Sequence, residues 1–230
     1  MNMKQLVTCI IAVIAMAFPF AVSAQNKDYN RAEVTYTRTW ADHTGEQNLD
    51  FDLNGIGVSY MHGFSLSQTV PIFLEVGGKF TTYFSSSDEH DLRDAFNLQP
   101  NQKMDINLKS TMLNIAVPVN FGYRFNLGNT CNLMPYVGLY GRAHLWAKSK
   151  ADYKLWTNDR LVAHDKTENN PLKKDDNGKT PLKRFQAGWV IGANFQYKPI
   201  TLGLNFGTGF IKTRDNYTVY EISASVGYCF

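Results

Sequence analysis

Alternation of apolar and polar side chains recurs eight times along the chain, and it limits the fold more than any other feature. A period of two residues is typical of β-strands with two unlike faces, and no helical period of useful length follows residue 24. The eight stretches are 31–40, 55–64, 72–84, 108–125, 135–148, 184–197, 201–210 and 217–230. We therefore predict an all-β fold with eight strands.

Each stretch separates its residues into two faces. One face of 72–84 carries Leu74, Val76, Phe80 and Phe84, and the other carries Glu75, Lys79, Thr81 and Tyr83. A soluble barrel of lipocalin type buries its apolar face, whereas a membrane barrel turns that face to lipid, and alternation alone does not distinguish the two.

Aromatic placement and loop length favour the membrane barrel. Aromatic residues close the stretches on the apolar parity, as interfacial girdles require: Phe64, Tyr123, Phe125, Phe195, Tyr197, Tyr228 and Phe230 at one rim, and Trp40, Phe84 and Phe210 at the other. Long connectors (41–54, 85–107, 149–183) alternate with tight ones (65–71, 126–134, 198–200). The sequence thus predicts an eight-stranded antiparallel up-and-down transmembrane β-barrel, with long loops on one side and tight turns on the other.

Residues 1–24 form a predicted signal peptide. Lys4 precedes an apolar run from Leu6 to Phe20, and Val22-Ser23-Ala24 is the small-residue pattern at which signal peptidase cuts. The run is shorter than the ~20 residues of a spanning helix. We expect export and a mature barrel domain of residues 25–230.

Composition excludes several classes of protein. The 230 residues are 44% hydrophobic, 19% charged and 13% aromatic, which fits neither a multi-helix membrane protein nor a disordered chain. With 23 basic and 20 acidic side chains, the charge balance gives no reason to expect nucleic-acid binding. No metal-ligand cluster, phosphate-binding glycine loop or nucleophile elbow occurs, so we predict no cofactor, no metal and no catalytic residue.

The C-terminal stretch from Tyr220 to Phe230 alternates strictly and ends on Phe. With this stretch, the leader and the eight alternating segments, the chain resembles the small eight-stranded outer-membrane barrels, the outer membrane β-barrel domain or porin-family group. The resemblance implies the outer membrane of a Gram-negative bacterium. It also implies that Tyr220, Ile222, Val226, Tyr228 and Phe230 form the signal read by the outer-membrane assembly machinery.

Charged residues on the polar parity are expected inside the barrel, where they must pair. They are Glu33, Glu75, Lys79, Arg124, Arg142, His144 and Glu221. We interpret them as a bracing network, with a gated polar pathway as the alternative. Glycines such as Gly55 and Gly207 leave space that large inward residues, with Phe73, Tyr83, Tyr136, Tyr140 and Trp146 as candidates, can fill.

Two long connectors carry opposite charge. Residues 148–184 hold ten basic against six acidic side chains, and 85–107 hold five acidic against two basic. Both are predicted to be solvated surface loops. The basic one is a candidate contact for lipopolysaccharide or another surface, through Lys148, Lys150, Lys154, Lys173 and Lys174. Cys131 and Cys229 both lie on the tight-turn side, and whether they form a disulfide depends on their separation.

Three functions remain open. The first is a non-enzymatic outer-membrane protein whose loops serve envelope integrity, adhesion or surface recognition. The second is a narrow channel for small solutes. The third, an enzyme that modifies lipid A, has only the loop residues His43 and His164 as candidates, neither with a nucleophile at a suitable spacing.

Overall fold

The computed structural model describes residues 27–43, 51–89, 99, 101–158, 160–174, 182–210 and 217–230. The predicted signal peptide lies outside this part of the chain. Among the described residues, no helix is long and apolar enough to cross a membrane. The strands are β1 (Tyr29–His43), β2 (Phe51–Ser65), β3 (Ile72–Glu89), β4 (Gln102–Tyr123), β5 (Phe125–Asn126), β6 (Cys131–Thr157), β7 (Arg160–Asn169), β8 (Phe185–Tyr197), β9 (Ile200–Gly209) and β10 (Tyr217–Cys229).

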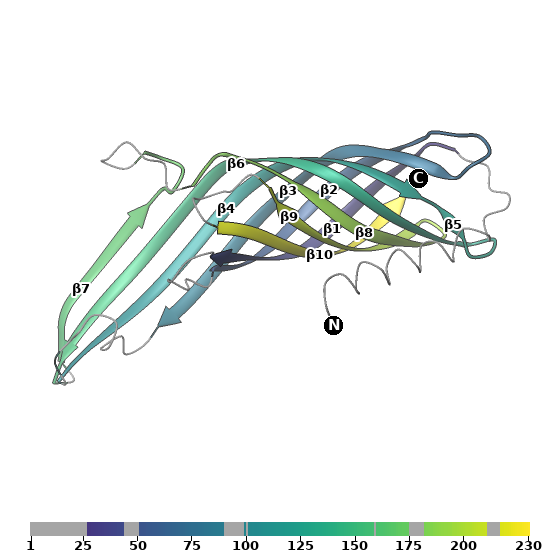
Figure 1. Cartoon of the computed structure of the whole chain (residues 1–230). Helices are drawn as coiled ribbons and strands as arrows, with labels where there is room; N and C mark the ends of the chain where they lie inside the picture. Colours follow the sequence, from purple (N-terminus) through teal and green to yellow (C-terminus); the bar gives the residue numbers. More distant parts are fainter. Residues whose placement is uncertain are drawn as a thin grey trace.

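Eight of these strands close into a ring. The order is β4-β3-β2-β1-β10-β9-β8-β6, and β6 pairs with β4 to complete the barrel (Figure 1). Every pairing in the ring is antiparallel. Because the ring is closed, its strands have no open edge within the barrel wall. The predicted fold class is therefore confirmed. Strands β5 and β7 lie outside the ring, each paired to β6.

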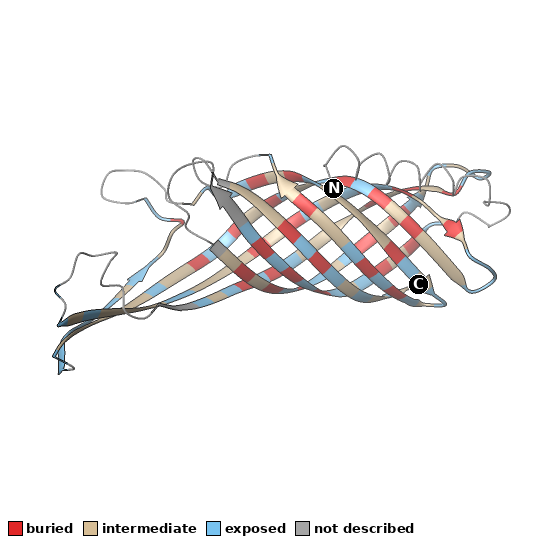
Figure 2. Cartoon of the chain, turned by 60° about the horizontal axis from the view of Figure 1, so that its bottom comes forward, coloured by how far each residue is buried: buried red, intermediate tan, exposed pale blue. Residues whose placement is uncertain are grey.

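The two faces of the wall are polar inside and apolar outside. Along β1, Thr35, Thr37 and Thr39 are buried, whereas Val34 and Tyr36, on the alternate positions, are exposed. The same alternation runs along all the barrel strands, seen as the regular sequence of red patches in Figure 2. Large apolar side chains such as Leu139 (58% exposed) and Leu204 (64% exposed) point away from the ring. This is the arrangement of a barrel whose outer face meets lipid.

Glycines and tyrosines fit together inside the ring. A Cβ placed on Gly55 would lie 2.9 Å from the Tyr83 ring, and one on Gly192 would lie 2.6 Å from the Tyr136 ring. Both tyrosines are buried. Small residues on one strand thus make room for large ones on the neighbouring strand, as the sequence predicts. The lumen is packed with side chains.

The sequence prediction is wrong about the connector 149–183. Strand β6 continues to Thr157 and returns as β7, so much of this segment is regular hairpin and not loop. Strand β4 begins at Gln102 and pairs with β6 up to Thr157, and β3 follows β4 as far as Glu89. These strands carry a sheet beyond the barrel, at lower left in Figure 1. We call the part formed by residues 102–111, 148–157 and 160–169 the projecting sheet.

Trp146 points outward, contrary to the prediction. The register of the β4–β6 ladder shifts at Leu113/Asn114: Leu113 pairs with Trp146, and Asn114 pairs with His144. Leu145 is the extra residue of this β-bulge, which reverses the alternation beyond it. Trp146 consequently stands on the apolar outer face, 45% exposed.

Candidate functional site

Two groups of polar side chains fill the lumen. The first, the turn-side cluster, lies toward the tight turns and is centred on Glu75, which is fully buried. Nη1 of Arg31 lies 2.7 Å from Oε1 of Glu75, and the Tyr29 hydroxyl donates to the same oxygen at 2.7 Å. Asn120 donates to the other carboxylate oxygen at 3.4 Å. Side chains from β1 and β4 therefore solvate one buried carboxylate of β3.

Arg31 connects this cluster to the rest of the wall. Its Nε lies 3.1 Å from Oε1 of Glu33, and the Asn194 amide, oriented with its oxygen toward the guanidinium, accepts from Nη1 at 2.7 Å. Ser59 and Ser225 donate to Glu33 at 3.3 and 3.2 Å. The charges of Arg31, Glu33 and Glu75 are thus satisfied within the protein, as burial requires.

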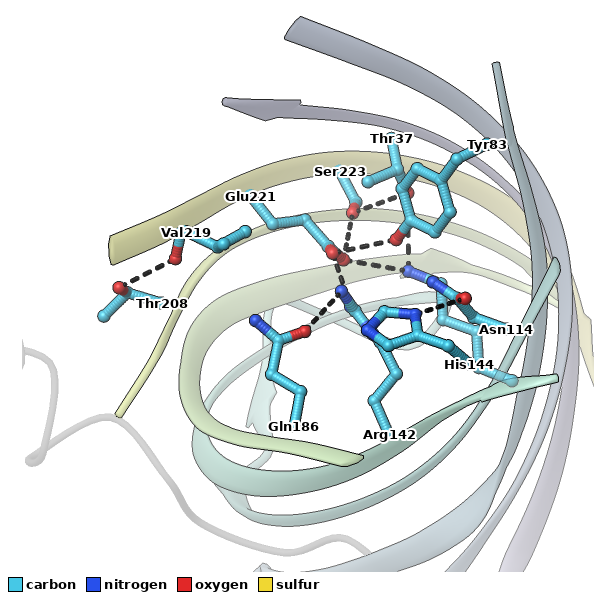
Figure 3. Close-up of polar contacts among 11 residues, drawn as sticks. Thr37, Tyr83, Asn114, Arg142, His144, Gln186, Thr208, Val219, Glu221 and Ser223 are labelled. Atoms are coloured by element: carbon cyan, nitrogen blue, oxygen red, sulfur yellow. Dashed lines mark hydrogen bonds and ion pairs between the residues drawn. The ribbon is translucent and has the colours of Figure 1, made fainter. Parts of the chain in front are cut away.

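The second group, the sheet-side cluster, is centred on Glu221 (Figure 3). Arg142 donates to Oε2 of Glu221, to which the Tyr83 hydroxyl also donates at 2.9 Å. Lys79 lies 3.4 Å from Oε1. Ser223 bonds Thr37 at 2.9 Å and extends the network to β1. This network ties four strands of the ring across the lumen.

Further polar side chains lie beyond Arg142 toward the projecting sheet. Gln186 accepts from Arg142 at 3.4 Å, and Nδ1 of His144 lies 2.7 Å from Oδ1 of Asn114. Within the described ranges, Asn114 Nδ2, His144 Nε2, Gln186 Nε2 and Thr39 Oγ1 are buried and have no hydrogen-bond partner among protein atoms. Water is the ordinary partner for such groups.

Arg124 closes the lumen at the tight-turn end by stacking on aromatic rings, not through an ion pair. Its guanidinium carbon lies 4.5 Å from the centre of the Tyr29 ring and 4.2 Å from that of Phe73. Both rings are buried and belong, with Met134, to one apolar cluster. A cavity beside it, lined by Arg124 and Cys229 among others, has a volume of about 10 Å³, room for roughly one water molecule.

The structure thus places all seven predicted charged residues on the lumen side, but in four separate settings. Glu33 and Glu75 belong to the turn-side cluster, and Lys79, Arg142 and Glu221 to the sheet-side cluster. His144 bonds Asn114 and Arg124 stacks on aromatic rings. The sequence analysis missed Arg31, the central cation of the turn-side cluster, although it opens the first stretch on the same parity as Glu33.

The projecting sheet inverts the polarity of the barrel wall. Most residues that continue the outer face are charged or ionisable: Lys103, Asp105, Lys109, Lys148, Lys150, Asp152, Lys154, His164, Lys166 and Glu168. Those that continue the lumen face are largely apolar: Met104, Ile106, Leu108, Ala151, Tyr153, Leu155 and Ala163. The change falls between the outer pair Leu113/Trp146 and the next outer pair, Thr111/Lys148.

Ion pairs connect β6 and β7 across the charged face. Lys148 lies 2.5 Å from Glu168, and Asp152 lies 2.8 Å from His164 and 3.3 Å from Lys166. Desolvation acts to raise the pKa of Asp152, but hydrogen bonds and charge from His164 and Lys166 outweigh it and lower that pKa. The hydrogen bond from Lys148 lowers the pKa of Glu168 as well. Both carboxylates are thereby held in their charged form.

The predicted surface contacts fall in two places. Lys148, Lys150 and Lys154 lie on the charged face of β6, whereas Lys173 and Lys174 follow β7 and are exposed. The residues predicted as assembly signal, Tyr220, Ile222, Val226, Tyr228 and Phe230, all lie on the outer parity of the C-terminal segment, and Tyr220 stacks on Trp40 at 5.9 Å between ring centres.

Cys131 and Cys229 are free thiols. Cys229 lines the cavity at the turn end of the lumen, and Cys131 stands on the opposite parity from the inward Asn132 and Met134. The pair therefore does not bridge in this structure. His164 lies on the projecting sheet beside Asp152, whereas the side chain of His43 lies outside the described residues.

Comparison with known proteins gives a family match. The family model described as outer membrane protein beta-barrel domain matches residues 6–230. No curated protein matches the chain. Among solved structures, Ail of Yersinia pestis in complex with the heparin analogue sucrose octasulfate is 12% identical, with 89% of this chain and 99% of that chain covered and a TM-score of 0.39.

Two further structures are similar to a comparable extent. Neisserial surface protein A is 13% identical, covering 87% of this chain and 96% of that chain at a TM-score of 0.38. The outer membrane enzyme PagL is 10% identical, covering 85% and 98% at a TM-score of 0.41. Similarity at this level carries no conclusion about function.

Proposed function

Because the chain belongs to the family of outer membrane protein β-barrel domains, it is an outer-membrane β-barrel protein, and we propose that its barrel anchors a surface-recognition element. That element is the projecting sheet. The observation that carries the proposal is its construction: β4 and β6 run without interruption from the barrel wall into the sheet, and β7 widens it. The sheet is therefore a direct continuation of the barrel wall.

The charges of the sheet support recognition of an anionic surface. Its outer face holds six lysines against three acidic side chains: Lys103, Lys109, Lys148, Lys150, Lys154 and Lys166 against Asp105, Asp152 and Glu168. Lys173 and Lys174 add two exposed cations next to it. A basic surface attracts lipopolysaccharide, acidic polysaccharides or acidic proteins at long range and gives binding that weakens with salt.

The packed lumen argues against a channel as the main role. Two ion-pair clusters cross it, and Arg124 stacked on Phe73 closes the end opposite to the projecting sheet. A solute path would have to break buried ion pairs, and breaking such a pair typically costs about 3–5 kcal/mol. We therefore place conduction of small solutes second to surface recognition.

An enzymatic role has less support. On the projecting sheet His164 bonds Asp152 at 2.8 Å, which is the orientation that a base needs. Lys166 contacts the same carboxylate, and no serine or cysteine contacts His164 in the described part of the chain. Without a nucleophile, the hydrogen bond between His164 and Asp152 has no reacting group to activate. We therefore propose a non-enzymatic protein.

Export and assembly follow the same proposal. We propose that residues 1–24 are removed as a signal peptide in a Gram-negative bacterium, and that Tyr220, Ile222, Val226, Tyr228 and Phe230 are read by the outer-membrane assembly machinery. This apolar row faces outward on the C-terminal segment, which closes the ring against β1.

Removal of the β6–β7 hairpin tests the function. In a variant with residues 151–167 replaced by a short Gly-Asn-Gly turn, cells should lose salt-sensitive adhesion to surfaces coated with acidic polysaccharide. Assembly is checked by the heat-dependent electrophoretic mobility of the barrel, which should remain that of the unmodified protein.

A matched control changes charge at the other end of the barrel. Lys198 lies exposed in the tight turn between β8 and β9, and Lys198→Gln should leave adhesion unchanged. Adhesion that survives loss of the hairpin on acidic, neutral and basic surfaces alike would disprove the recognition role.

A further inference from the structure

Lys109 of β4 and Lys150 of β6 stand directly opposite each other in the ladder, on the same outer face. Side chains in such pairs have Cβ atoms roughly 4.5–5.5 Å apart, and like charges in this position destabilise a sheet. Both lysines are exposed. A sheet stabilised by cross-strand ion pairs elsewhere thus keeps one repulsive pair.

The protein compensates this repulsion only in part. Lys150 lies 3.7 Å from Oε2 of Glu168, but Lys148 lies closer to the same carboxylate, at 2.5 Å. Lys109 forms no ion pair with any residue whose side chain the structure describes, and its other ladder partner is the neutral Ser86. Lys148 and Lys150 therefore share one carboxylate, and with Lys109 beside them the three ammonium groups outnumber it, which leaves net positive charge between β4 and β6.

The three lysines lie just above the lipid-facing part of the wall. Leu113 and Trp146 are the last outer pair with apolar side chains, and Trp is typical of the membrane interface. Four residues separate Leu113 from Lys109, about 13 Å along a strand, or roughly 10 Å along the membrane normal at the usual tilt. Lys148 lies about half as far away. Headgroups extend about 5–7 Å beyond the hydrocarbon core. Lys148 therefore lies at their depth, and Lys109 and Lys150 lie within one side-chain length of it.

We propose that Lys109, Lys148 and Lys150 bind a phosphate group of a lipid in the outer leaflet of the protein's own membrane. The oxygens of one phosphate can accept from ammonium groups on both strands, and its charge turns the repulsive Lys109–Lys150 pair into a bridged one. The inference rests on the proposed function in placing the sheet outside the membrane, and it adds one specific ligand, a lipid phosphate of the protein's own membrane, at the base of the sheet.

The test measures binding of lipid A to the full chain in detergent, with bisphosphorylated and dephosphorylated lipid A as probes. The variant Lys109→Gln/Lys150→Gln should bind the phosphorylated lipid about tenfold or more weakly. Its affinity for the dephosphorylated lipid should equal that of the unmodified protein. The control Lys103→Gln/Arg160→Gln removes the same charge at the tip of the sheet, six residues beyond Lys109 along β4, and should bind both lipids as the unmodified protein does.

A second readout separates a binding site from a structural role. In detergent without phosphorylated lipid, Lys109→Gln/Lys150→Gln should resist urea at least as well as the unmodified protein, because the substitution removes a repulsion. Equal loss of affinity in both double variants, or equal binding of the two lipids by the unmodified protein, would overturn the proposal. Loss of lipid affinity with unchanged adhesion would support the phosphate site and leave the adhesion experiment to judge the proposed function separately.

Discussion

Arg31 and Glu75 form an ion pair, 2.7 Å between Nη1 and Oε1, that joins two strands of the ring that are not neighbours. Strand β2 separates β1 from β3 in the wall, so this pair joins the two strands through the lumen and not along a hydrogen-bonded ladder. Both side chains are almost fully buried. Contacts of this kind fix the cross-section of the barrel, which the hydrogen bonds between neighbouring strands leave adjustable.

Replacement of Glu75 by Leu should destabilise the barrel strongly. Arg31 keeps Glu33 but loses its closest partner, and breaking a buried pair in this way costs about 3–5 kcal/mol. The free energy of unfolding can be measured by urea titration in lipid vesicles with tryptophan fluorescence.

The double variant Arg31→Met/Glu75→Leu is the control for this loss. It removes both charges, so it should recover a large part of the stability lost in Glu75→Leu. If the double variant is as unstable as the sum of its single changes, the two residues are not coupled and the account of the turn-side cluster is wrong.

Arginine on the outer face should report the position of the membrane. Leu139 lies near the middle of the apolar part of β6 and is 58% exposed. Leu139→Arg should cost about 2–4 kcal/mol in the unfolding free energy in vesicles, the usual cost at the bilayer midplane. Leu161 on β7 is 47% exposed but lies on the projecting sheet, and Leu161→Arg should change that free energy by less than about 0.5 kcal/mol. Equal costs at the two positions would contradict the proposed lipid boundary.

The barrel should not conduct ions. The sheet-side cluster and the stacked Arg124 fill the lumen at two levels, and the cavity at the turn end has room for about one water molecule. Protein inserted in a planar bilayer should give no discrete conductance steps, under conditions in which a trimeric porin gives them. Reproducible steps that disappear on Glu221→Gln would instead establish an ion path through the lumen.

Acid should loosen β7 before it affects the barrel. Asp152 and Glu168 have folded-state pKa values below their ordinary ones, so their stabilisation is complete above the unfolded-state values near pH 4 and is lost as the pH falls through the lower, folded-state values. The effect is modest because the pairs are exposed. Amide exchange, corrected for intrinsic rates, should show residues 160–169 losing protection relative to 201–209 between pH 6 and pH 3. The variant Asp152→Asn/Glu168→Gln should show the same low protection at both pH values, and a drop in this variant equal to that of the unmodified protein would exclude the ion pairs as its cause.

Alternation alone predicts most of the barrel. The eight stretches correspond to the eight ring strands, and parity separates outer residues such as Val76 from lumen residues such as Glu75. It does so because a strand with one apolar face leaves only two choices of orientation, and the aromatic rims decide between them. Pairing partners inside the lumen are not visible in this way: Arg31 and Glu75 lie far apart in sequence and meet only after the ring closes.

Two further features escape sequence analysis for physical reasons. The bulge at Leu145 carries no distinctive residue, so the reversal that turns Trp146 outward cannot be recognised from local pattern. The projecting sheet also alternates, with Lys150, Asp152 and Lys154 against Ala151, Tyr153 and Leu155. A strand matched to the thickness of a membrane has about 9–11 residues, so a length criterion of this kind leaves no place for the second half of β6.

The continuity of β4 and β6 determines how the molecule bears mechanical load. A pull on the tip of the projecting sheet, at Thr157 or Gln102, acts along strands that end at the opposite side of the barrel, at Cys131 and Tyr123. The ladder hydrogen bonds lie across this direction and are loaded together in shear, not opened one after another. An attachment made at the tip would therefore transmit tension directly into the wall.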